Sequence, residues 1–215
     1  MRIPRGVGSY WLALLLMAGS LAAEARPDVV VILADDLGFA DLGCYGSEIP
    51  TPHLDGLAAT GLRMTDFSNA ARCCPSRAAL LTGRSPHAVG LGGMVQAGPG
   101  RAYQGFLDPA IPTLAEHFAG AGYRTIGIGK WHVGHARPHW PVDRGFQESW
   151  CFLDGATDAW AVSPGRLVRG EADTGLGGRH LTDAIADETV TADPMVLMEH
   201  CMAVGHPALT MDPLL

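Results

Sequence analysis

The run of residues 28–33, Asp-Val-Val-Val-Ile-Leu, is the strongest constraint on the fold of this 215-residue chain. A strand that is apolar on both faces belongs in the middle of a parallel sheet with helices on each side. Asp35 and Asp36 follow it, at the carboxyl end where such sheets bind ligands. Two adjacent carboxylates repel each other unless a cation lies between them, and hard oxygen ligands suit calcium or magnesium. The alternative for an isolated Asp-Asp pair is a polar strand end followed by a turn.

A second strand and its helix support this reading. Residues 111–123 have the apolar spacing of an amphipathic helix, and residues 124–129 have the composition of a strand. A strand-helix-strand order favours a parallel sheet, so we expect an α/β fold with a mostly parallel central sheet flanked by helices. We also expect a short helix over residues 51–61, a strand over 62–68 and a glycine-rich loop over 85–105.

The stretch from Cys73 to Arg84 predicts a helix with an unusual start. Pro75 suits the first turn, where its missing N–H group would be unpaired anyway, and Gly83 ends the helix. Position 73 then lies at a helix N-terminus, which favours an anion or a polarised oxygen. Arg77, four residues later, returns to the same face with a planar charged group suited to sulfate or phosphate oxygens. Alternatively, Cys73 and Cys74 are ordinary buried cysteines before a core helix.

Lys130 is the only lysine of the chain and directly follows the predicted strand 124–129. On an extended segment, Lys130 and His132 project to the same side because they are two residues apart. Both side chains can therefore reach one anion, with the alternative that Lys130 is a solvated surface residue.

The quoted residues resemble the motifs of the sulfatase family. Cys73 to Gly83 is similar to the signature Cys-x-Pro-Ser-Arg followed by Leu-Thr-Gly, residues 34–38 and 41–46 to the N-terminal metal motif, and residues 129–134 to a Gly-Lys-Trp-His-x-Gly segment. The resemblance implies an alkaline-phosphatase-like fold and sulfate-ester hydrolysis, of a small aryl ester or a sulfated glycan. It also implies that a formylglycine-generating enzyme oxidises Cys73 to formylglycine.

The resemblance further implies roles for individual residues. Asp35, Asp36 and position 73 would bind calcium, with magnesium as the alternative, and Arg77 would act beside the nucleophile. Lys130 and His132 would contact the sulfate, and His132 would also serve near the leaving oxygen as a general acid. Two other functions remain open: a phosphonate or phosphodiester hydrolase of the same superfamily, and an inert fragment.

The N-terminus and the composition bear on localisation. Residues 1–25 have a basic start, an apolar stretch and a small-x-small cleavage site, which indicates a signal peptide and a secreted or periplasmic product. An uncleaved anchor is the alternative, but the apolar stretch is short for a stable membrane span. A net charge of −7 gives no indication of nucleic-acid binding.

The resemblance ends before the chain does. It covers residues 26–188 as the N-terminal part of a sulfatase catalytic domain and leaves 189–215 as an unmatched tail. The second metal-binding pair of the family, Asp-Asn, is absent, and Asn69 is the only asparagine. We therefore expect a truncated catalytic domain that lacks ligands for its cation.

A frameshift or premature stop near position 189 would explain this end of the resemblance. Resequencing the gene with its downstream DNA is expected to show a sulfatase-like continuation in another reading frame. If no such continuation is present, the explanation is wrong.

Overall fold

The computed structural model describes residues 26–191 and 196–199. Its sheet has six strands in the order β1-β6-β2-β3-β4-β5. The pairs β1–β6, β6–β2 and β2–β3 are parallel, and β4 and β5 are added antiparallel. The mostly parallel sheet confirms the expected α/β fold class. The strands are β1 (Val29–Ile32), β2 (Ile126–Lys130), β3 (Glu148–Phe152), β4 (Leu167–Arg169), β5 (Ala172–Asp173) and β6 (Val196–Glu199).

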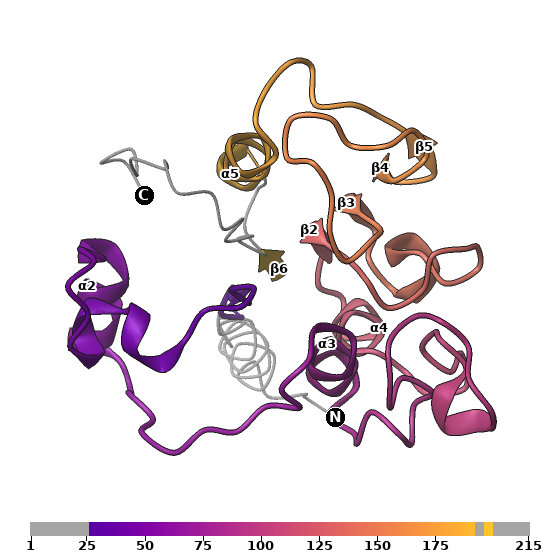
Figure 1. Ribbon diagram of the computed structural model, residues 1–215, viewed down its shortest axis with the longest axis horizontal. Helices are drawn as coiled ribbons and strands as arrows, with labels where there is room; N and C mark the ends of the chain where they lie inside the picture. The colour runs from indigo at the N-terminus through magenta and orange to yellow at the C-terminus, as the bar shows by residue number, and fades with distance from the viewer. Residues whose placement is uncertain (1–25, 192–195, 200–215) are drawn as a thin grey trace, which may run out of the picture.

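Helices lie on both sides of the central strands. In Figure 1, α3 and α4 lie on one side of β2 and β3, and α5 lies on the other. Short 3-10 helices occur in the connections. The α-helices are α2 (Pro52–Thr60), α3 (Cys73–Thr82), α4 (Leu114–Gly120) and α5 (Leu181–Thr191), and the 3-10 helices are η1 (Phe39–Asp41), η2 (Gly43–Tyr45), η3 (Arg101–Tyr103) and η4 (Pro141–Arg144).

Two hydrophobic cores form because side chains alternate across the strands. Ile126 and Ile128 of β2 pack with the buried residues of α5. On the opposite face, Cys151 of β3 packs with the buried residues of α3 and α4. Gly127 of β2 lies on that second face, where a Cβ atom would come within 3.0 Å of the Phe146 ring. The glycine therefore lets the aromatic side chain approach the sheet.

Two expectations about strands were wrong. The run at 28–33 does form a parallel strand, but β1 lies at an end of the described sheet and not in its middle. Val30 and Ile32 are each 50% exposed as a result. Residues 62–68 form no strand, because no described strand pairs with them, and Leu62 and Phe67 remain exposed.

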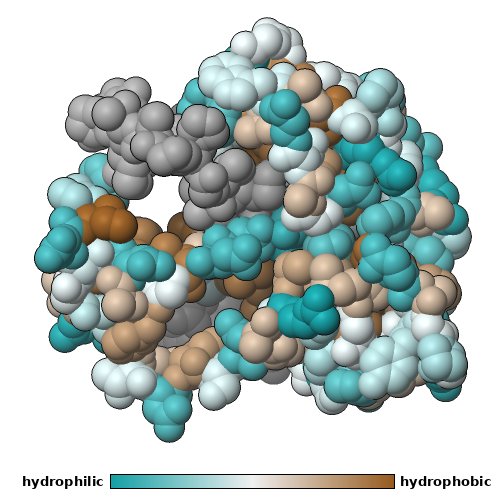
Figure 2. All heavy atoms as spheres, viewed as in Figure 1, coloured by the Kyte–Doolittle hydropathy of each residue, from teal (hydrophilic) through white to brown (hydrophobic). Residues whose placement is uncertain are grey.

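Large apolar side chains are exposed along the N-terminal third of the described chain. Figure 2 shows brown, apolar atoms at the left, in the region of α2. Contiguous exposed apolar surface marks a place of contact with another protein, a membrane or a ligand. The exposed apolar residues of this region are Val30, Ile32, Leu37, Phe39, Ile49, Leu54, Leu57, Leu62, Met64 and Phe67.

The last described elements extend past residue 188, the expected limit of the resemblance. Helix α5 continues to Thr191, and β6 lies between β1 and β2 in the sheet. The boundary at residue 188 and the signal peptide at 1–25 stay predictions, and the signal peptide falls outside the described residues. Within residues 26–191 and 196–199, no helix has the length and apolar character needed to cross a bilayer.

Substitutions at two glycines can show the effect of backbone conformation on stability without any effect of side-chain crowding. Gly83 ends α3 with a φ of 63°, whereas Gly56 lies inside α2, and a Cβ atom would meet nothing within 4 Å at either position. We expect Gly83→Ala to lower the free energy of unfolding by about 1 kcal/mol, because the left-handed conformation disfavours a side chain. Gly56→Ala is expected to raise it by about 0.5–1 kcal/mol. Urea unfolding measures both, and shifts in the same direction would contradict this account.

Candidate active site

Residue 73 is the first residue of α3, as the sequence predicts. Arg72 is the N-cap, with extended backbone and no side-chain hydrogen bond to the helix, and Gly83 closes the other end in the left-handed conformation. Pro75 occupies the first turn. The first amide groups of the helix and the positive end of its dipole therefore gather beside the partly buried Cys73 side chain.

Asp35, Arg77 and Lys130 form an ion cluster beside this helix. Lys130 Nζ lies 2.6 Å from Asp35 Oδ2, and Arg77 Nη2 lies 4.0 Å from Asp35 Oδ1. Arg77 Nη1 also donates a hydrogen bond of 2.6 Å to the carbonyl oxygen of Lys130. The cluster thus connects the segment after β1, helix α3 and the carboxyl end of β2.

Both cations of the ion cluster are buried. The side chains of Arg77 and Lys130 are 5% and 3% exposed, and that of Asp35 is 15% exposed. Burial lowers the pKa of Arg77 to about 10, and the charge of Asp35 opposes this change. Arg77 therefore stays charged at neutral pH. The three side chains of the cluster together carry a charge of +1, and its two buried cations can attract an anion.

His132 lies at the same place, but with a backbone conformation that the sequence did not predict. Its φ is 52°, so the segment after β2 is not extended at this residue, and the expected alternation of side chains does not apply. The left-handed turn nevertheless places His132 beside the ion cluster. A Cβ atom on Gly155 would lie 2.2 Å from His132 Cε1, so the absence of a side chain there leaves room for the imidazole.

The His132 imidazole is buried and neutral. Its pKa is lowered to about 4, first by burial and then by the positive charges of Lys130 and Arg77, while Asp35 acts in the opposite direction. Its Nδ1 atom is buried without a hydrogen-bond partner among the described residues. A buried polar nitrogen without a partner is rare in folded proteins, and a catalytic role or a bound water or ion are among its explanations.

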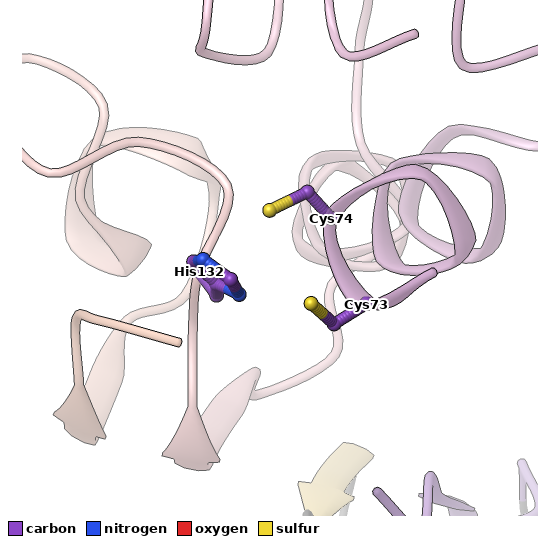
Figure 3. A group of neighbouring side chains, drawn as sticks. All are labelled: Cys73, Cys74 and His132. Atoms are coloured by element: carbon purple, nitrogen blue, oxygen red, sulfur yellow. The ribbon is translucent and has the colours of Figure 1, made fainter. Parts of the chain in front are cut away.

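Cys73 and Cys74 both point toward His132 (Figure 3). The two Sγ atoms and an imidazole nitrogen lie within 4.8 Å of one another. Cys74 is fully buried, and burial raises the pKa of its thiol to about 12. The sequence did not single out Cys74, because the second position of the Cys-x-Pro-Ser-Arg pattern accepts any residue.

The structure does not bring the two predicted aspartates together around one centre. Asp35 lies within the ion cluster, but Asp36 is exposed and has a left-handed backbone with a φ of 54°. The other predicted residues, Cys73, Arg77, Lys130 and His132, converge with Asp35 as described. Their catalytic and binding roles remain a proposal.

A second group near His132 was missed by the sequence argument. The His135 ring lies 6.2 Å from that of His132, centroid to centroid, and His135 Nδ1 lies 3.4 Å from Asp154 Oδ1. Arg166 Nε lies 3.2 Å from Asp154 Oδ2. His135 could have been suspected from its position three residues after His132, but nothing in the sequence pairs it with residues 154 and 166.

The sulfatase family model matches residues 27–197. The chain belongs to the sulfatase family. It is similar to an arylsulfatase of Klebsiella aerogenes, 39% identical over 150 residues, which cover 68% of this chain and 32% of that enzyme. The sulfatase match thus includes every residue of the ion cluster, both cysteines and His132.

Solved structures agree with the sulfatase assignment. Ps i-CgsB in complex with k-i-k-neocarrahexaose superposes with a TM-score of 0.69 and 28% identity, over 85% of this chain and 46% of that one. BT4656 in complex with its substrate D-glucosamine-2-N,6-O-disulfate gives a TM-score of 0.66 and 25% identity, over 85% of this chain and 35% of that one. This sulfatase chain therefore spans about a third to a half of the length of these proteins.

The depressed pKa of His132 predicts a pH-dependent stability of the sulfatase fold. Between the ordinary histidine pKa of about 6.5 and the folded value of about 4, the unfolded chain binds more protons at this residue. The contribution of neutral His132 to the free energy of unfolding is therefore present above pH 6.5 and is lost as the pH falls toward 4. It is on the order of 2–3 kcal/mol at most. His132→Gln is expected to flatten this part of the stability curve, measured by urea unfolding from pH 4 to 8. The exposed His117→Gln serves as the control, and an equal flattening in both variants would contradict the assignment.

Proposed function

We propose that this chain carries the catalytic centre of a sulfuric ester hydrolase, which releases inorganic sulfate from an aryl or carbohydrate sulfate ester. The observation that carries the proposal is the convergence of Cys73, Arg77, Lys130 and His132 at the N-terminus of α3. Support for the substrate class comes from a relative named arylsulfatase and from a similar structure whose substrate is a sulfated glucosamine.

The proposal includes oxidation of Cys73 to formylglycine by a formylglycine-generating enzyme. Position 73 fits this group, because it is partly accessible, begins a helix and lies near the charge of Arg77. When present and hydrated, the aldehyde supplies one hydroxyl group that attacks sulfur and a second one whose deprotonation releases sulfate. A serine would lack the second hydroxyl group.

The residues of the ion cluster would bind the sulfate group. Its oxygens meet the two cations of this cluster, where Lys130 acts as a point charge, and the helix N-terminus adds backbone donors. Asp35 holds the Lys130 ammonium group in place, and the Lys130 carbonyl oxygen holds Arg77. These contacts keep both cations oriented before an anion arrives, so little reorganisation is needed on binding.

His132 would act near the leaving oxygen. Its imidazole is neutral in the absence of an anion, because burial and two neighbouring cations lower its pKa. A bound sulfate ester adds a negative charge that offsets those cations and raises the pKa again. The capacity of His132 to donate a proton therefore increases when substrate is present, which suits a general acid.

A divalent cation at Asp35, Asp36 and the oxygen of residue 73 is also part of the proposal, with calcium first and magnesium second. Among the described residues, neither aspartate belongs to a group of three or more potential metal-ligating side chains, and Asp35 Oδ2 contacts Lys130. Calcium prefers 6–8 oxygen ligands. These residues alone do not fit a calcium ion, and we derive no catalytic step through it.

We further propose that the protein is secreted or periplasmic, on the basis of residues 1–25. Cleavage after residue 25 would leave the described residues intact. The activity proposed here belongs to the whole catalytic domain, and this chain covers only 32% of the Klebsiella aerogenes enzyme and 46% of Ps i-CgsB.

The modification and the activity are tested on secreted protein co-expressed with a formylglycine-generating enzyme. We expect the tryptic peptide containing Cys73 to lose about 18 Da, the difference between a thiol and an aldehyde side chain. Hydrolysis of an aryl sulfate in the presence of calcium is then measured, with Cys73→Ala as the inactive control. The matched aryl phosphonate distinguishes a phosphorus-centred hydrolase.

The two readouts separate the possible failures. Modification with turnover supports the proposal, and faster hydrolysis of the phosphonate would replace it with the phosphorus-centred alternative. Modification without turnover indicates an inert fragment. An unmodified Cys73 contradicts the role of this residue.

A further inference from the structure

The thiol form of the site contains a compact set of soft metal ligands. Cys73 Sγ, Cys74 Sγ and one imidazole nitrogen of His132 lie within 4.8 Å of one another (Figure 3). We propose that the unmodified chain binds Zn²⁺ through these three side chains. The proposal concerns the protein before any conversion of Cys73, and it does not rest on the proposed hydrolase activity.

The distances suit a tetrahedral ion. Zinc lies about 2.3 Å from a thiolate sulfur and about 2.0–2.1 Å from an imidazole nitrogen, so two ligand atoms of one tetrahedral site are about 3.5–3.8 Å apart. The upper limit of 4.8 Å therefore requires movements of about 1 Å or less. Side-chain rotation on the first turn of α3 can supply movements of this size without unfolding the helix.

The chemistry of the donors selects a thiophilic cation. Two sulfur atoms and one imidazole are the ligands of zinc sites, whereas calcium and magnesium require oxygen. Two thiolates and a neutral imidazole balance the charge of Zn²⁺, so the complex would add no net charge beside Arg77 and Lys130. Those two cations already have Asp35 as a counter-ion.

The imidazole of His132 is prepared for this role in two ways. The residue is only 4% exposed, and its Nδ1 atom has no hydrogen-bond partner within the described part of the chain. The absence of a side chain at Gly155 also leaves room for the ring beside the two cysteines. A ring nitrogen without a competing hydrogen-bond partner is available to a metal ion.

The buried thiol of Cys74 must lose its proton when the metal binds. Burial alone opposes this loss, but coordination deprotonates a thiol directly, and proton release accompanies binding. Cys73 is only partly buried and offers an entry route for the ion. Three protein ligands leave the fourth position to water, so we expect an open site of moderate affinity.

The test uses the full chain expressed without a formylglycine-generating enzyme, with intact mass confirming that Cys73 is still a thiol. Cys201 lies outside the described residues and is replaced by Ser in every sample to remove its background. Zn²⁺ binding is measured by anaerobic calorimetric titration. Replacement by Co²⁺ provides a spectrum in which thiolate-to-metal charge-transfer bands report sulfur ligands.

We expect one Zn²⁺ per chain and a cobalt spectrum typical of two thiolates. Cys73→Ser, Cys74→Ser and His132→Gln should each weaken binding by at least about tenfold, because the loss even of an outer-shell partner costs that much. Cys44→Ser is the matched control, since Cys44 is a free thiol far from this cluster in the chain, and it should leave binding unchanged.

Two further measurements test zinc binding independently of misfolding and of enzymatic activity. Far-UV circular dichroism selects variants that retain the wild-type fold, and Cys74→Ala replaces Cys74→Ser if the buried hydroxyl group destabilises the core. Zn²⁺ should also slow alkylation of Cys73 at least about tenfold, a protection expected for a metal-bound thiolate. Retained affinity in folded Cys74 or His132 variants, loss of binding in Cys44→Ser, or a cobalt spectrum without sulfur bands would each overturn the proposal.

Discussion

The buried ion cluster of Asp35, Arg77 and Lys130 holds together three segments that are distant in the sequence. Its contacts join the end of β1 to α3 and to the end of β2. Removing Asp35 would take a carboxylate partner away from two buried cations, at a cost of about 3–5 kcal/mol. The position of residue 73 relative to His132 depends on the same contacts, because α3 and the segment after β2 are both fixed by Arg77.

The sequence predicted the parts of this arrangement that depend on local chemistry. A proline in the first turn and a glycine after the last turn define α3, so the place of residue 73 followed from Pro75 and Gly83. Lys130 was placed correctly at the carboxyl end of β2, because a strand of alternating isoleucine and glycine is easily recognised. The α/β class followed from the order of these elements.

Features that depend on distant partners could not be predicted in this way. Residues 62–68 have strand-like composition but no neighbouring strand, and β1 is exposed on one face despite its apolar run. The left-handed backbone of His132 is set by its surroundings, among them the space over Gly155. The juxtaposition of Cys74 with His132, and that of His135 with Asp154, likewise arise only from packing between segments.

The single lysine of the chain has a consequence for any chemistry directed at amines. Lys130 carries the sole side-chain amino group of the protein, and that group is 3% exposed and in contact with Asp35. A reagent that acylates amines therefore has two targets, the terminal amino group and a buried one inside the candidate active site. Amine-directed coupling to beads, dyes or cross-linkers therefore attaches the protein by its N-terminus. Slow labelling of Lys130 measures how often the site opens.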